Sequence, residues 1–209
     1  MKNLKPIIIL MLFVTSLAFS QKLKVTGGVN IMNIDYAVSA PNTETPTDEQ
    51  PTDTDLPTKF TNSKSTSLYN TTTVSAIDFS ETSNETGFYL GLALADINLS
   101  DKLELQPEVR FVAVKDFNQI QIPVLVAYNI SDKFSAQVGP SLGFLLDAGD
   151  TVKSTNLAID FGLSYDISGD FSIAARYDWG QTNLLEGGDS DNYLKINNIQ
   201  IGIAYQFGN

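Results

Sequence analysis

Five charged residues stand within strongly apolar stretches of the chain and are the first candidates for a functional site. Two neighbouring carboxylates can act as general acid and base when their surroundings keep one protonated and the other ionised. Carboxylates and guanidinium groups together can instead form ion pairs that fill an interior. A catalytic dyad of Glu108 with Asp160 or Asp178 remains possible, but the sequence favours a structural ion-pair network. The five residues are Glu108, Arg110, Asp160, Arg176 and Asp178.

The residue types that the chain lacks narrow the chemistry further. It contains no histidine and no cysteine among its 209 residues. Histidine is the side chain that titrates near neutral pH, and imidazole and thiolate are the usual ligands of zinc. We therefore expect no enzymatic activity, no catalytic residue and no cofactor or metal. The formal net charge of −11 also argues against nucleic acid as a partner, because nucleic acid requires basic surfaces.

Two motifs in predicted loops are weaker candidates for a functional site. Residues 186–192 gather oxygen ligands suited to Ca²⁺, namely Glu186, Asp189, Asp191 and Asn192, without the spacing of an EF-hand. A solvated acidic loop is the simpler interpretation. Residues 150–152, Asp-Thr-Val, resemble a short bacterial O-glycosylation sequon, but three residues carry little weight.

The first 20 residues have the pattern of a secretory signal peptide. Lys2 and Lys5 precede the apolar run from Pro6 to Val14, which is too short to span a bilayer, and small residues stand at Ala18 and Ser20. We therefore expect residues 1–20 to be removed, which leaves one domain over residues 21–209.

The rest of the chain alternates between apolar and polar residues with a period of two, which predicts β-strands. The alternation is interrupted near Met32–Ile34 and at Asn197–Asn198, where we expect slips in register, and a bulge is expected near Asp96. Eight strands are predicted, over residues 23–36, 87–99, 103–114, 122–130, 134–146, 156–167, 171–180 and 194–207.

The predicted connections alternate in length. Tight turns fall at residues 98–102, 131–133 and 168–170, whereas most connections at the other end are longer. The longest, residues 37–86, is rich in Pro, Thr and acidic residues, a composition typical of a disordered loop, and we expect no strand in it. Short turns at one end and long loops at the other are typical of transmembrane barrels.

The residue types on the two faces of the predicted strands distinguish a membrane barrel from a soluble one. One face carries bulky apolar residues, with aromatic residues near the strand ends. The other carries small and weakly polar residues, which suit a narrow barrel interior better than a water-exposed surface. We therefore predict an all-β, eight-stranded antiparallel up-and-down transmembrane β-barrel with one long extracellular loop.

Four segments of the sequence together resemble a known family. "LELQPEVRF", "IPVLVAYNISDKFSAQVGPSLGFLL", "FSIAARYDWGQTNL" and "NNIQIGIAYQF" resemble the PorT-type outer-membrane β-barrel domain family of Bacteroidota. Gln106-Pro107-Glu108, Gly139-Pro140 and Arg176-Tyr177 carry most of the resemblance. It implies an outer-membrane location and insertion by the barrel-assembly machinery, and it says little about activity.

The sequence thus predicts a non-enzymatic barrel that sits in outer-membrane lipid and presents loops to an unknown extracellular or envelope partner. Its interior is expected to be plugged by the network of Glu108, Arg110, Asp160, Arg176 and Asp178, with Asp160 roughly opposite Arg176. Two alternatives remain open, a narrow channel for small solutes and a soluble periplasmic barrel that binds an apolar ligand.

Overall fold

The computed structural model describes residues 22–39, 78–149 and 151–208, and in this part of the chain all regular structure is antiparallel β-sheet. The predicted signal peptide and most of the predicted long loop lie outside the described residues. The strands are β1 (Lys22–Ser39), β2 (Asp78–Ala95), β3 (Ile97–Ser100), β4 (Leu103–Ala113), β5 (Gln119–Asn129), β6 (Phe134–Leu145), β7 (Thr155–Asp166), β8 (Phe171–Gly180) and β9 (Tyr193–Phe207). The described part of the chain contains no helix that is long and apolar enough to cross a membrane.

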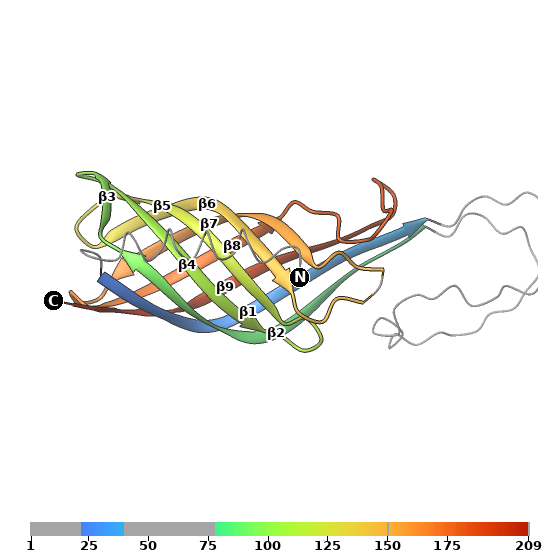
Figure 1. The fold of residues 1–209 in the computed structure, drawn as a ribbon, viewed down its shortest axis with the longest axis horizontal. Coiled ribbons are helices and arrows are strands. Elements are labelled where there is room, and N and C mark those ends of the chain that lie inside the picture. The colour runs from blue at the N-terminus through green and yellow to red at the C-terminus, as the bar shows by residue number, and fades with distance from the viewer. Residues whose placement is uncertain (1–21, 40–77, 150, 209) are drawn as a thin grey trace, which may run out of the picture.

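The sheet closes on itself as a barrel (Figure 1). Each strand from β4 to β9 pairs with the next along the chain, β1 pairs with both β2 and β9, and β2 pairs with β4. β2 and β3 are two parts of one strand that is interrupted at Asp96. The φ of Asp96 is 64°, and the register against β4 shifts at this residue. The fold is therefore the predicted eight-stranded up-and-down barrel, with the predicted bulge at Asp96.

The alternation of connection lengths is also confirmed. Residues 101–102, 130–133 and 167–170 make short turns at one end, which we call the turn end. β1 begins and β9 ends there as well (Figure 1). The opposite end, the loop end, carries the connections over residues 114–118, 146–154 and 181–192.

Two expectations about β1, β2 and β9 were wrong. β1 pairs one-to-one with β9 from Leu23–Phe207 to Ala37–Tyr193, without a slip near Met32–Ile34 or at Asn197–Asn198. The sequence suggests slips because the lumen becomes apolar toward the loop end. Inward-facing residues there no longer differ in polarity from the outward-facing ones. The expected strand-free loop, 37–86, is also too long, because β1 runs to Ser39 and pairs with β2 from Asp78 onward.

The outer surface is an apolar belt that follows the predicted faces. Along β5 and β6, Leu125 points into the lumen and is 1% exposed, whereas Val138 points outward and is 47% exposed. Aromatic residues gather on the outside near the turn end, where the rings of Phe171 and Tyr205 lie 4.7 Å apart and those of Tyr205 and Phe207 4.6 Å apart. Such a belt is typical of lipid contact and contradicts the alternative of a soluble barrel with its apolar face inward.

The belt generates a prediction about depth in the bilayer. An arginine on the lipid face costs about 2–4 kcal/mol at the midplane and about 0–1 kcal/mol near the interfaces. We expect Val138→Arg, in the middle of β6, to lower the free energy of unfolding in phospholipid vesicles by the larger amount. Leu99→Arg, at the turn end of β3, is the matched control and should cost little. Equal costs at the two positions would contradict a membrane-embedded belt.

Candidate functional site

All five charged residues singled out in the sequence are buried inside the barrel, and Arg110 contacts two of the carboxylates. Its side chain is 0% exposed, with one guanidinium nitrogen 3.1 Å from a carboxylate oxygen of Glu108 and 3.5 Å from one of Asp160. The guanidinium also donates to Gln121 Oε1 at 3.3 Å and to the side chain of Gln200, and it lies 5.6 Å from the ring centroid of Tyr89. Five strands, β2, β4, β5, β7 and β9, thus supply polar partners or an aromatic face to one buried cation.

Arg176 pairs with Glu108, not with Asp160 as expected. Arg176 Nη1 lies 2.6 Å from Glu108 Oε2, across the lumen between β8 and β4. The predicted register was wrong by two residues, because Asp160 faces Asp178 and Arg176 faces Gly162. A shift of two leaves every side chain on its predicted face and changes only its partner.

Asp178 has no ion pair among the described residues and is held by amides instead. Its Oδ2 accepts hydrogen bonds from Gln121 Nε2 at 2.8 Å and Asn198 Nδ2 at 3.2 Å. Asn30 and Gln200 continue this layer, since Gln200 Nε2 donates to Asn30 Oδ1 at 3.0 Å. These amides connect the charged residues to β1, β5 and β9.

Glycine makes the room that the network needs. Glu108 Oε1 accepts a hydrogen bond from Thr26 Oγ1 at 2.6 Å over the backbone of Gly91. A Cβ at Gly91 would lie 2.5 Å from Glu108 Oε1 and 2.6 Å from Thr26 Oγ1. Any other residue at this position would therefore displace the carboxylate that pairs with both arginines.

The contacts of Glu108 bear on the alternative of a catalytic carboxylate dyad. Both oxygens of Glu108 are engaged. Oε1 accepts from Thr26 and from Arg110 Nε, and Oε2 pairs with both arginines. None of the five charged residues lines the cavity at the turn end, where a substrate could enter. A dyad of Glu108 with an aspartate would need a carboxylate that is free to exchange a proton with a bound substrate. Among the described residues, no group of three or more His, Cys, Asp or Glu side chains could hold a metal ion.

A second closure, not predicted from the sequence, lies above the network at the loop end. We call it the apolar cap. Leu184 enters it from the β8–β9 loop and is 0% exposed, and Val152 of the β6–β7 loop forms a β-bridge with Leu185. Backbone bonds from Lys153 N to Leu184 O (2.7 Å) and from Glu186 N to Thr151 O (3.0 Å) join the two loops. The buried members of the cap are Met32, Ile34, Tyr89, Val112, Val114, Leu145, Leu184, Leu194 and Ile196.

The β8–β9 loop also contains the acidic residues considered for Ca²⁺. Asp189 Oδ1 accepts hydrogen bonds from the backbone N–H groups of Asn192 (2.8 Å) and Asp191 (2.9 Å). These bonds, that of Asn192 first, lower the pKa of the exposed Asp189 carboxyl. The carboxylate therefore organises a turn of the loop.

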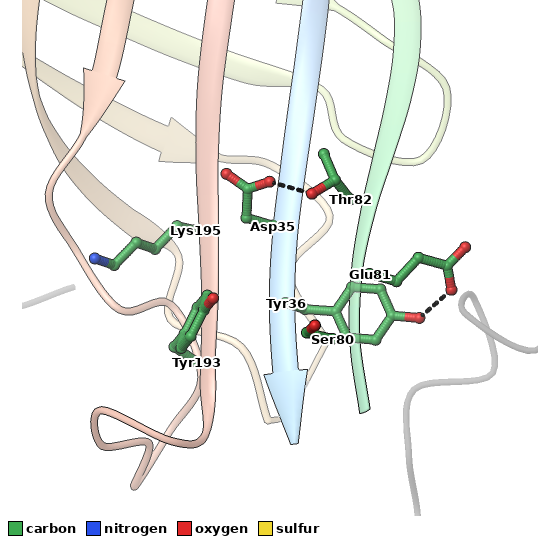
Figure 2. Close-up of a pocket in the computed structure, with 7 residues that line it drawn as sticks. All are labelled: Asp35, Tyr36, Ser80, Glu81, Thr82, Tyr193 and Lys195. Carbon is green, nitrogen blue, oxygen red and sulfur yellow. Dashed lines mark hydrogen bonds between the residues drawn. The ribbon is translucent and has the colours of Figure 1, made fainter. Parts of the chain in front are cut away.

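Beyond the barrel wall, three strands continue as a narrow ribbon. We call residues 33–39 of β1, 78–84 of β2 and 193–197 of β9 the projecting ribbon (Figure 1). Figure 2 shows a shallow pocket on it, where Asp35 accepts a hydrogen bond from Thr82 Oγ1 (2.8 Å) and Tyr36 donates to Glu81 (2.9 Å). The ring of Tyr36 also packs against the apolar cap. The other residues that line this pocket are Ser80, Tyr193 and Lys195.

The closed barrel, its lipid-facing belt and its filled lumen define an outer-membrane type of protein. The chain belongs to the family described as the outer membrane protein beta-barrel domain, which matches residues 7–207. The protein is therefore an outer-membrane β-barrel. No protein with a curated description matches the chain.

Solved structures with a similar fold are distant in sequence. Ail, the attachment invasion locus protein of Yersinia pestis, in complex with the heparin analogue sucrose octasulfate, is 12% identical with a TM-score of 0.43, over 90% of this chain and 99% of that one. Neisserial surface protein A is 10% identical with a TM-score of 0.41, over 88% and 97%. A designed transmembrane β-barrel is 13% identical with a TM-score of 0.41, over 86% and 96%. We draw no functional inference from likenesses this distant.

The ion-pair network generates a prediction about stability. Glu108→Gln removes the carboxylate shared by two buried arginines, and breaking a buried ion pair in this way costs about 3–5 kcal/mol. We expect that loss in the free energy of unfolding, measured by urea titration in vesicles. Glu104→Gln, a half-buried position four residues away on β4, is the matched control and should change little. A similar loss in both variants would mean that the network does not stabilise the barrel.

Proposed function

We propose that this protein is a non-enzymatic outer-membrane barrel that presents its loop end, and above all the projecting ribbon, to a partner outside the cell. The observation that carries the proposal is the contrast between the two parts of the molecule. The lumen is closed twice, by the ion-pair network and by the apolar cap, whereas the ribbon extends a polar three-stranded surface beyond the lipid-facing belt. Solute passage requires an open lumen, and surface recognition requires only an exposed, rigid platform.

The cellular route is part of the same proposal. We propose that residues 1–20 direct export, that the barrel-assembly machinery inserts the barrel, and that the chain is a PorT-type protein of Bacteroidota. The support is the signal-peptide pattern and the resemblance of the Gln106-Pro107-Glu108 and Arg176-Tyr177 segments. The absence of histidine and cysteine from the whole chain supports a non-enzymatic role.

Conductance tests the closed lumen against the alternative of a narrow channel. In a planar bilayer, we expect no stable openings from the wild type, because eight strands leave an interior that side chains fill. Arg176→Ala and Leu184→Ala each weaken one closure and leave the other, so each single variant should stay closed. The double variant should show small, flickering currents. Steady openings in the wild type would replace this proposal with a channel.

Single cysteines test which end faces the outside, because the chain has no native cysteine. Lys195→Cys lies on the projecting ribbon and Asp132→Cys in a turn, and both positions are exposed. A membrane-impermeant maleimide should label position 195 on intact cells and position 132 only after the outer membrane is permeabilised. The reverse pattern would place the ribbon in the periplasm and overturn the proposal.

The ribbon position also tests for a partner. A photo-crosslinking residue at position 195, on cells of the native organism, should give a discrete adduct. The same residue at position 133, an exposed turn position that does not line the cavity at the turn end, is the matched control. Crosslinks from position 133 alone would locate the main interaction at the turn end and contradict recognition by the ribbon.

A further inference from the structure

The lumen opens at the turn end into a cavity of ≈ 480 Å³ that the ion-pair network does not fill. Short turns face the periplasm in barrels of this type, so in the proposed orientation the cavity faces the periplasm. Its wall comes from β1, β4, β5, β6, β7, β8 and β9 and from the turns at this end. The cavity therefore belongs to the mouth of the barrel at the turn end. A ligand bound there would not contact the partner proposed for the loop end.

The charge of the cavity is strongly one-sided. Its only basic side chains among the described residues are Lys24 and Lys102. Asp96 is already paired, since its carboxylate lies 3.3 Å from Lys22 Nζ, but Asp101, Asp132 and Asp166 form no ion pair among the described residues. The acidic side chains that line the cavity are Asp96, Asp101, Glu104, Asp132, Asp166 and Asp170.

The floor of the cavity supplies a second, independent feature, a buried hydrogen-bond acceptor without a partner. Gln137 is 6% exposed and lines the cavity. Its Nε2 donates to Gln106 Oε1 at 3.2 Å, which fixes the orientation of the amide, while its Oε1 accepts no hydrogen bond. A buried amide oxygen left unpaired is unfavourable, so a ligand that donates a hydrogen bond to it regains part of that cost.

Gly162 on β7 faces Gln137 directly, so no side chain from this position covers Gln137 Oε1. A Cβ at Gly162 would lie 3.1 Å from Arg176 Cγ and 3.3 Å from Gln137 Oε1, so a larger residue here would crowd both side chains.

We propose that this cavity binds a positively charged peptide segment, with one lysine ammonium group donating to Gln137 Oε1. An ammonium group has three donors and no acceptor, which matches an acceptor below a ring of carboxylates. The carboxylates of Asp101, Asp132 and Asp170 stand on three different turns. No three carboxylates among the described residues are placed to hold a single metal ion, and carboxylates on separate turns suit a chain that carries more than one positive charge.

The test uses the purified full-length barrel in neutral detergent at low salt and a fluorescent peptide, Gly-Lys-Gly-Lys-Gly. We expect binding by fluorescence anisotropy and at least tenfold weaker binding of the same peptide with both lysines acetylated, which removes charge and donors. Spermidine is the competitor that represents a small polyamine. Binding of spermidine without binding of the peptide would overturn the proposed occupant.

Matched variants separate a built site from general attraction to an acidic protein. Gln137→Leu should weaken peptide binding about tenfold, the expected effect of losing one hydrogen bond to a charged group. Gln137→Glu keeps the size of the side chain, adds a carboxylate and should strengthen binding. Asp166→Asn should weaken binding, whereas Asp191→Asn, the same charge change at the loop end, should not.

Three results would overturn the proposal. They are no binding of the lysine peptide, equal weakening by Asp166→Asn and Asp191→Asn, or unchanged binding in both Gln137 variants when heat-modifiable gel mobility shows them folded.

Discussion

The guanidinium of Arg110 has no contact with water, and much of the lumen is arranged by the need to surround it with acceptors. An unpaired buried charge costs several kcal/mol. Several strands around the lumen must therefore each place a specific group at the same depth in the barrel as Arg110. Glu108, Asp160, Gln121 and Gln200 do so from β4, β7, β5 and β9. A sliding strand would remove one of these partners, so the network helps to fix how the strands are aligned in the barrel.

The filled middle divides the molecule into two ends with different surroundings. At the loop end, Leu184 and its apolar neighbours seal the lumen beneath the projecting ribbon. At the turn end, the interior stays polar and open as far as Gln106 and Gln137. Recognition at one end is therefore chemically independent of recognition at the other, and a ligand at either end meets a solid floor.

The sequence predicted what depends on alternation and missed what depends on exact alignment. Strand positions, faces and the five inward charges follow from a period of two. A shift of two residues leaves that pattern unchanged, which is why Asp160 was expected to face Arg176 and instead faces Asp178. The apolar cap was missed for a related reason. Inward-facing Met32 and Ile34 resemble a slipped register when the interior is assumed to be polar throughout. Leu184 lies outside any strand, so no periodicity marks it.

The pairing of β1 with β9 constrains how the chain folds in time. Leu23 meets Phe207, so the closing ladder joins the two ends of the domain and can form only after a loop of most of the chain has been brought together. Until then, β1 and β9 each have an edge of unpaired N–H and C=O groups, which hydrocarbon does not tolerate. Closure and entry into the bilayer must therefore be a single, slow, concerted event, and a half-built barrel has no stable place within the membrane.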